Sequence, residues 1–253
     1  MIPIKTQAEI ERMREGGRRL AWVLGKTLKA VRPGISLKEL DQLAESLIEK
    51  QEGKPSFKMV KNYHWATCLN VNEGVVHGIP GDYRLKKGDF ASLDIGLFYK
   101  GRHADMARTI KVGDGKIEMD KNNFLKAGAL ALAKAIKAAK EGNQLGHISR
   151  AIEKEIKKAG FNPVRALTGH GVGKKLHEEP QIPCYLEGEI EKTSRLSSGM
   201  VLAIEVIYTQ EKTDIVLDPD GWTVKTADGK LAGLFEDTVL VLSKSGEVLT
   251  RSN

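Results

Sequence analysis

The sequence predicts an α+β fold of two similar halves, in which each half places a pair of helices before antiparallel strands. Pairs of helical segments recur at an offset of 108 residues, marked by the turn glycines Gly34 and Gly142. Apolar strands with a central carboxylate recur at an offset of 111 residues, at Asp94 and Glu205. Unless this similarity is due to chance, the halves meet about a pseudo-twofold axis and bring the carboxylates together. No Pro- or Ser-rich linker separates them, so residues 1–253 are expected to form one domain.

The four helices are predicted from apolar residues that recur with helical spacing. They lie at about 7–31, 36–52, 120–141 and 145–159, and a Gly-containing turn joins the two helices of each pair. The first helix begins within MIPIKTQAEIERMREGG, which lacks the apolar centre of a signal peptide, so a cytosolic location is expected. The longest lipophilic stretch, GALALAKAIKAA, is interrupted by lysines, and no membrane partner is expected.

The first strands are predicted from two apolar runs with a turn between them. GDFASLDIGLFY is followed by the turn at residues 99–102, which should fold ADMARTIKV back as a hairpin. Pairing centred on this turn makes the numbers of directly opposed residues add up to 201, so Asp105 opposes Gly96. Asp105 then lies one diagonal step from Asp94 on the same face. Two carboxylates that share a face repel each other unless a proton or a cation lies between them.

The second half contains three further strand segments. GMVLAIEVIYTQ and GLFEDTVLVLS each hold a glutamate between apolar residues, Glu205 in the first and Glu236 in the second. Between them, the segment 209–234 has turn signals at PDG and ADG and is expected to form a hairpin.

Composition indicates an ordinary globular protein. The formal charge of +7 is explained by a solvated basic surface or, alternatively, by an anionic partner such as a nucleic acid; DNA is not expected. Cys68 and Cys184 give no disulfide framework and favour a reducing compartment, and the sequence contains no CxxC zinc motif.

The stretch TGHGVGKKLHEEP, residues 168–180, combines two histidines with three glycines. A helix would lose about 3 kcal/mol through the glycines relative to alanine, so an extended strand followed by a turn is predicted. The glycines then share one bare face, open to a neighbouring backbone or a ligand, while His170 points the other way and His177 follows in a loop. Either histidine alone is more often an ordinary polar or packed residue than a catalytic one.

Four strand-borne carboxylates together with one imidazole favour a metal centre. The set comprises Asp94, Asp105, Glu205, Glu236 and His170, and its oxygen-rich character suits manganese, iron or cobalt better than a thiolate-type zinc site. Four negative charges balance two divalent cations, which indicates a dinuclear centre. Such a centre can hold a bridging hydroxide, which favours hydrolysis of an amide or a phosphoester. No phosphate-binding loop is evident, so amide hydrolysis is preferred.

The chain resembles the type I methionine aminopeptidases, which have the pita-bread fold. The resemblance covers nearly the whole length and is carried by NEGVVHGIP at 72–80, SLDIG with DMART at 92–109, TGHGVGKKLHEEP, AIE, GWTVKT and FEDT. It implies removal of the initiator methionine from nascent proteins and peptides whose second residue is small.

The resemblance also implies roles for the metal ligands. Asp94 would chelate one metal ion, His170 and Glu205 the other, and Asp105 and Glu236 would bridge the two. Glu205 would in addition act as the acid and base that passes a proton between the bridging water and the leaving amine.

Two histidines and a pocket complete the implied site. His77 would guide the substrate, and His177 would contact the scissile peptide and stabilise the tetrahedral intermediate, with the glycines letting the substrate approach the backbone. Tyr63, Cys68 and Trp222 would line a methionine pocket, soft, apolar and aromatic, as a thioether requires. Trp222 follows a PDG turn and could instead simply pack there.

The sequence departs from the type I pattern at four places that concern the pocket and the choice of second residue. Leu176 replaces a phenylalanine, Phe57 a cysteine and Val206 a proline, and the stretch 183–198 is longer than usual. All five ligand positions are filled.

Two other functions compete with this interpretation. Proline-specific aminopeptidases and dipeptidases share the ligands, but they usually carry an extra N-terminal domain and lack HEEP. A non-catalytic protein of this fold could bind ribosomal RNA, although such relatives generally lose ligands. Ribosome contact could also accompany catalysis, a hypothesis that rests on the net charge of +7 and on Arg12, Arg14, Arg18 and Arg19, whose alternative role is helix solvation.

Overall fold

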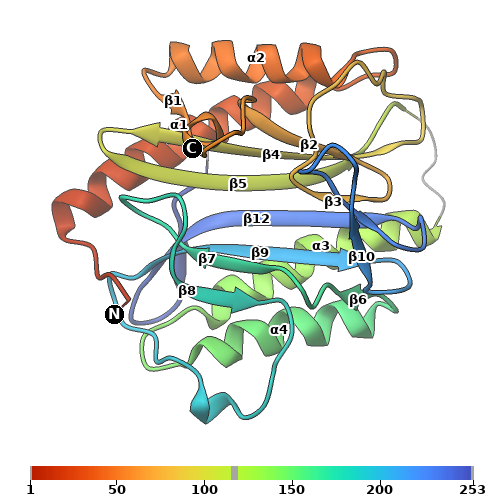
Figure 1. Ribbon diagram of the computed structural model, residues 1–253. Helices are drawn as coiled ribbons and strands as arrows, with labels where there is room; N and C mark the ends of the chain where they lie inside the picture. The colour runs from red at the N-terminus through yellow and green to blue at the C-terminus, as the bar shows by residue number, and fades with distance from the viewer. Residues whose placement is uncertain (1, 115–118, 252–253) are drawn as a thin grey trace.

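A computed structural model describes residues 2–114 and 119–251 of the chain (Figure 1). Within them lie four α-helices, which confirm the predicted pairs: α1 (Gln7–Ala30), α2 (Leu37–Lys50), α3 (Met119–Ala138) and α4 (Leu145–Lys158). The observed helices end one to three residues before the predicted positions.

Local sequence explains where the first two helices begin. Thr6 and Ser36 each accept a hydrogen bond from the backbone N–H three residues later, and the glutamates at those positions, Glu9 and Glu39, bond back to the cap backbone. These capping boxes satisfy N–H groups that a helix start leaves unpaired. Gly34, in the turn between the two helices, has φ +90°, a conformation that favours glycine.

The strands of the described residues form a large sheet and a small one. The ten-stranded sheet follows the order β1-β4-β5-β12-β9-β7-β8, with β2 beside β4, β6 beside β9 and β13 beside β12. The three-stranded sheet has the order β10-β11-β3. The strands are β1 (Lys54–Pro55), β2 (Thr67–Val71), β3 (Gly74–Val76), β4 (Phe90–Tyr99), β5 (Arg102–Lys111), β6 (Asn162–Pro163), β7 (Thr168–Gly171), β8 (Glu178–Pro183), β9 (Val201–Thr209), β10 (Ile215–Leu217), β11 (Val224–Thr226), β12 (Ala232–Val241) and β13 (Gly246–Val248).

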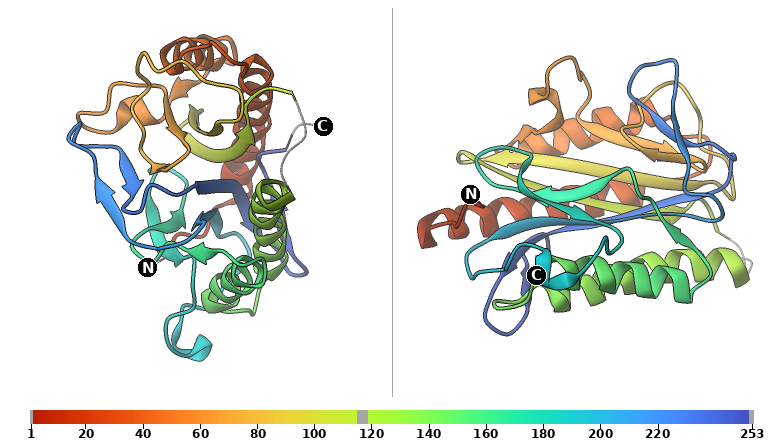
Figure 2. Two further views of the ribbon diagram at one scale, coloured as in Figure 1. Left: turned by 90° about the vertical axis from the view of Figure 1, so that its right-hand side faces the viewer. Right: turned by 60° about the horizontal axis from the view of Figure 1, so that its bottom comes forward.

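The two halves are arranged alike on either side of the β5–β12 junction. Helix α1 packs on the hairpin β4–β5, and α3 packs on β9 and β12. Figure 1 shows α1 and α2 over the first half and α3 and α4 over the second, and Figure 2 shows the helices on the outer side of the curved sheet, away from the hairpin β10–β11. The predicted duplication is therefore visible in the architecture.

The register of the β4–β5 hairpin matches its prediction. Asp105 opposes Gly96, and the turn residues Lys100 and Gly101 both have positive φ, 44° and 80°, as a two-residue hairpin turn requires. The second predicted hairpin forms between β10 and β11.

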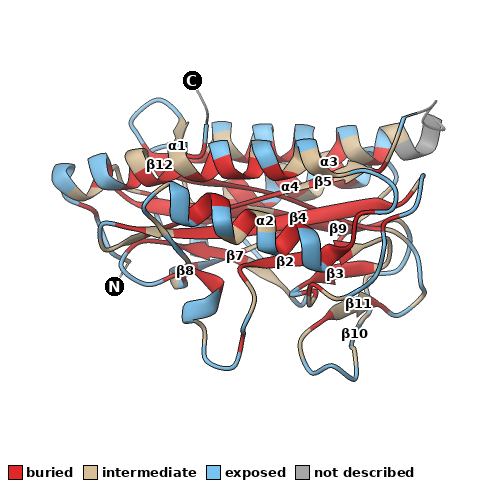
Figure 3. Cartoon of the chain, turned by 90° about the horizontal axis from the view of Figure 1, so that it is seen from above, coloured by how far each residue is buried: buried red, intermediate tan, exposed pale blue. Residues whose placement is uncertain are grey.

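The central strands are buried on both faces. All ten residues of β12 are buried, and β4 has one residue that is not. Figure 3 shows these strands covered by helices whose exposed residues lie on their outer sides. Acidic residues in such strands therefore do not sit at a solvated sheet edge. Among the described residues, no helix is long and apolar enough to cross a bilayer.

Two glycines of α1 provide a matched test of this packing. A Cβ at Gly17 would lie 2.6 Å from the carbonyl carbon of Leu249, whereas one at Gly25 would meet nothing within 4 Å. We expect Gly17→Ala to destabilise the protein by about 1–3 kcal/mol through overpacking. Gly25→Ala should stabilise it by about 0.5–1 kcal/mol, because alanine favours helix. Thermal or urea unfolding measures both, and a Gly17→Ala protein as stable as Gly25→Ala would contradict the packing.

Candidate metal centre and active site

Four carboxylates lie on one face of four adjacent strands. Ala107 of β5 is opposed by Asp94 of β4 on one side and by Glu236 of β12 on the other. Glu236 is in turn opposed by Glu205 of β9. Because directly opposed residues share a face, as do residues two apart in a strand, Asp105 joins this row. The structure thus brings together all four acids that the sequence singled out.

His170 extends the row across β7. It is paired with Ala203, two residues before Glu205, and its Nε2 lies 3.6 Å from Glu205 Oε1. Its Nδ1 lies 2.8 Å from the carbonyl oxygen of Gly171, to which it donates, so Nε2 presents a lone pair to the carboxylates. A metal-ligating histidine is commonly oriented in this way.

Burial makes the pKa values of these acids high. Desolvation raises the pKa of Asp94 to about 8, although a hydrogen bond from Asp105 lowers it. Desolvation followed by repulsion from neighbouring carboxylates raises the pKa of Asp105 and of Glu236 far above the usual range, and the same two causes act on Glu205. Without a cation, the cluster holds protons at neutral pH.

The donor set fits divalent metal ions. Asp94 Oδ1, Asp105 Oδ1 and Glu236 Oε1 are buried and have no hydrogen-bond partner among the described residues. One ligand atom each from Asp105, His170 and Glu236 lie within 4.8 Å of one another. Unpaired oxygen atoms that converge beside an imidazole nitrogen are a suitable environment for a hard or borderline cation.

The glycines of the histidine motif make room for neighbouring strands. A Cβ at Gly169 would lie 2.6 Å from the carbonyl oxygen of Ala203, and one at Gly171 would lie 2.7 Å from the carbonyl carbon of Glu179. Of the two uses predicted for this bare face, close approach of backbone is therefore the one observed. The expectation that these two glycines let substrate approach is wrong, because β8 and β9 occupy that space.

Desolvation also keeps the three histidines of the site neutral. It lowers the pKa of His170 to about 4 and the pKa of His77 and His177 below their ordinary value. His177 lies in a bend before β8, with its ring centroid 4.4 Å from that of His170. His77 follows β3 and has φ 58°, an uncommon backbone conformation for a residue with a side chain.

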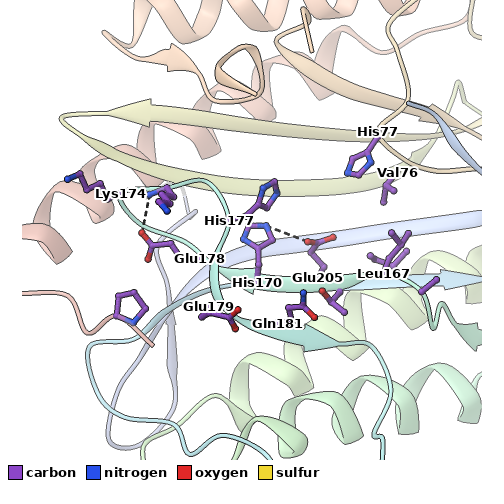
Figure 4. A pocket seen from close by; sticks show the side chains of 15 residues that line it. Val76, His77, Leu167, His170, Lys174, His177, Glu178, Glu179, Gln181 and Glu205 are labelled. Atoms are coloured by element: carbon purple, nitrogen blue, oxygen red, sulfur yellow. Dashed lines mark hydrogen bonds and ion pairs between the residues drawn. The ribbon is translucent and has the colours of Figure 1, made fainter. Parts of the chain in front are cut away.

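Two cavities meet at these residues, and Figure 4 shows the side chains that line the larger one. A small pocket of about 150 Å³ is lined by the four acids, and an open groove of about 840 Å³ lies beside it. Four residues line both: Val76, His77, His177 and Glu205. These residues therefore mark the boundary between the small pocket and the groove.

The small pocket is lined by the predicted trio of Tyr63, Cys68 and Trp222. The rings of Tyr63 and Trp222 meet edge to face at 5.1 Å, and the Tyr63 hydroxyl donates to the carbonyl oxygen of Thr67 at 2.9 Å. Burial raises the pKa of the Cys68 thiol, which stays protonated. Trp222 thus lines the pocket rather than only packing after its turn.

Of the four places where the sequence departs from the type I pattern, two lie in the pocket and two do not. Phe57 and Leu176 line it, whereas Val206 is buried opposite Phe235 and lines neither cavity. No described residue of 183–198 lines either cavity; this segment packs on α4, where Thr193 Oγ1 accepts from the Gly146 N–H. The expectation that Val206 and 183–198 affect the pocket directly is not supported.

Sequence reasoning did not find two apolar lining residues, Val60 and Val76. Val76 directly precedes His77 in VVHGIP, a position that could have indicated it. Val60 follows the short helix Phe57–Met59, and no local signal distinguishes it from an ordinary packed valine.

Comparisons with known proteins agree with this geometry. Residues 11–243 match the model of metallopeptidase family M24. The chain is 43% identical to methionine aminopeptidase 1 of Bacillus subtilis, over 99% of this chain and all of that protein. It is 40% identical to a methionine aminopeptidase of Clostridium perfringens, over 99% of each.

Solved structures show the same fold. The crystal structure of a methionine aminopeptidase from Thermotoga maritima superposes with a TM-score of 0.95 at 38% identity and covers both chains completely. A prolidase from Pyrococcus furiosus gives a TM-score of 0.78 at 24% identity, over 99% of this chain and 66% of that one, and so shows shared fold alone. The predicted pita-bread fold is confirmed.

The buried acids predict how metal binding depends on pH. In the metal-free protein, the folded state binds more protons than the unfolded state between about pH 4, the usual carboxylate pKa, and about 8, the pKa of Asp94. The contribution of these acids to stability is therefore highest at low pH and falls as pH rises through this window. A bound cation replaces the protons, so the gain in Tm caused by manganese should be larger at pH 8 than at pH 5.

Thermal unfolding with EDTA and with manganese across this window measures the effect. Asp105→Asn, which removes one of the four acids, is the control and should show a smaller gain. A gain that is equal at every pH would contradict the proposed link between cation binding and proton release.

Proposed function

The chain belongs to metallopeptidase family M24, and we propose that it is a methionine aminopeptidase, which removes the N-terminal methionine from peptides and nascent proteins with a small second residue. The observation that carries the proposal is that His77, His177 and Glu205 line both a small pocket and an open groove. The names of the relatives that the chain resembles over its whole length support the choice of methionine.

The two cavities suit removal of one residue from a chain end. The small pocket has room for a single side chain, and its walls of Tyr63, Cys68 and Trp222 suit a flexible thioether. Its floor of acids lies where the free α-amino group of that residue would be. The rest of the polypeptide extends along the open groove, so the peptide bond to be cut lies at the boundary.

The five clustered side chains would hold two divalent ions, such as cobalt, manganese or iron. Asp94 would bind one, His170 and Glu205 the other, and Asp105 and Glu236 would lie between them. Such ions, when bound, make water a stronger nucleophile and polarise the carbonyl group of a substrate. Four carboxylates balance the charge of two such ions.

The remaining chemistry belongs to residues at the boundary. Glu205 would take a proton from the attacking water and deliver it to the departing amine nitrogen. His177 and His77, neutral at pH 7, can donate N–H groups to the peptide oxygen and amide region of the substrate. Donors of this kind stabilise charge that develops only in the transition state.

Peptide and protein N-termini are the proposed partners, and the cytoplasm, where nascent chains and reduced thiols occur, is the proposed location. Ribosome contact is a further prediction, and the structure leaves fewer of the four arginines free for it. Arg14 and Arg19 form ion pairs with acidic residues of the same molecule, whereas Arg12 and Arg18 are exposed. Docking on ribosomal RNA would therefore depend on Arg12 and Arg18.

A peptide assay tests the proposed activity. Metal-free protein and protein supplied with manganese, iron or cobalt are incubated with Met-Ala-Ser and with Ala-Pro-Ala, and the products are identified by mass spectrometry. We expect methionine release only with metal. Cleavage confined to Ala-Pro-Ala would instead support a proline-specific peptidase, and no cleavage of either would contradict both.

Two substitutions test the boundary residues. Glu205→Ala should lower kcat by about 10²–10⁴-fold, because it removes the proton carrier, and should also reduce metal retention. His177→Ala should lower kcat by about 10²–10³-fold and leave metal content unchanged, because it removes a donor. His147→Ala, in α4, is the histidine control. Normal turnover in either site variant would remove its assigned role.

A further inference from the structure

A buried ion pair joins the N-terminal segment to the loop that carries His177. Lys5 Nζ lies 2.8 Å from Glu178 Oε2, and the two side chains are only 5% and 9% exposed. Lys5 precedes α1, and Glu178 directly follows His177. A charge pair at this depth is a strong, directional hydrogen bond, and either charge would be poorly solvated without the other.

Lys5 is itself held by the strand that carries Glu205. Its backbone N–H donates to the carbonyl oxygen of Gly199 at 2.8 Å, two residues before β9 begins. The next residue, Thr6, caps α1. The ammonium group of Lys5 is therefore fixed relative to both a long helix and the acid-bearing sheet.

Glu178 in turn organises the loop around His177. Its Oε1 accepts from the Lys175 N–H at 3.0 Å while Oε2 receives Lys5. The loop is also tied to β5, because the His103 N–H donates to the carbonyl oxygen of Gly173 at 2.8 Å. Figure 4 shows Glu178 close to His177, and a dashed line marks the hydrogen bond that Glu178 accepts from Lys175.

The chain is closely packed at Gly173, where the loop begins. A Cβ at Gly173 would lie 2.7 Å from Lys5 Cε and 2.9 Å from the Glu178 carboxylate oxygens. The ion pair therefore lies against bare backbone, and a side chain at position 173 would displace it. Lys5, Gly173 and Glu178 form one packed unit directly beside His177 in the chain.

We propose that Lys5 is a positioning residue for the reaction: through Glu178, it fixes the loop 173–178 so that His177 meets the substrate at the cavity boundary. This proposal rests on the proposed function of His177. If Lys5 loses its charge, the carboxylate of Glu178 is left buried and unpaired, and the loop must open to let water reach it. His177 then moves away from the transition state, and a displacement of about 1 Å costs about 100-fold in rate.

The test compares Lys5→Met, Lys5→Arg, Glu178→Gln and the double variant Lys5→Met/Glu178→Gln with the wild type. Steady-state kinetics on Met-Ala-Ser with manganese give kcat and KM separately, and metal content is measured on the same samples. Hydrogen exchange at the Lys175 amide, in metal-free protein, reports on the loop without relying on activity. Arg14→Met is the control, because it breaks a more exposed ion pair, between α1 and Glu247 of β13, that does not involve the loop.

We expect Lys5→Met to lower kcat by about 100-fold with KM and metal content unchanged, and to lose protection of the Lys175 amide. Lys5→Arg should recover most of the rate. The double variant should lose less of the wild-type kcat than Lys5→Met alone, since no unpaired carboxylate remains. Glu178→Gln keeps an acceptor for the Lys175 N–H, and its kcat should lie between those of Lys5→Met and Lys5→Arg. This variant preserves the test if Lys5→Met folds poorly.

Other outcomes would overturn the proposal. If Lys5→Met lowers Tm as Arg14→Met does but keeps the wild-type kcat, the pair only fastens the N-terminal segment. Loss of metal together with kcat would place the effect at the acids rather than at His177. If the wild type itself releases no methionine, the proposed function fails, and the Lys175 exchange rate still decides whether Lys5 holds the loop.

Discussion

Four carboxylates on one face of one sheet, three of them buried and Glu205 nearly so, are the constraint on which the structure depends. Burial raises the pKa of every member, and in Asp105, Glu205 and Glu236 repulsion from neighbouring carboxylates adds to desolvation. Such a cluster is unfavourable unless protons or cations occupy it, and the unpaired oxygens of Asp94, Asp105 and Glu236 point to cations. The cost of folding around these acids is thus offset only by what they bind, so the stability of the fold and its chemistry share one origin.

The architecture keeps the acids in place by fixing the register of the strands that carry them. On the opposite face of the sheet, Arg108 of β5 makes two hydrogen bonds of 2.9 Å to Asp237 of β12 and another to the carbonyl oxygen of Glu236. This contact locks β5 to β12 where the two halves meet. A slip of one residue would turn each acid to the wrong face, so register matters more here than in an ordinary core.

Much of this arrangement was predictable because it follows local rules. The helices follow from apolar spacing, and the place of Asp105 opposite Gly96 follows from a turn whose two central residues take positive φ. Contacts between distant segments had no such signal. Lys5 and Glu178 lie 173 residues apart, and nothing in either stretch indicates that they pair. Val60 is similar, since a valine that lines a pocket and one that fills a core look alike in sequence.

The residues of the site come partly from rigid strands and partly from irregular segments. The acids and His170 come from paired strands, where backbone hydrogen bonds limit movement, which suits ligands whose mutual spacing must be kept. His77 and His177 come from irregular segments at the cavity boundary, where they can meet a substrate as it enters. Irregular segments are mobile unless something holds them. A loop that must place a donor accurately therefore needs its own anchor, and the buried pair beneath His177 supplies it from the far end of the chain.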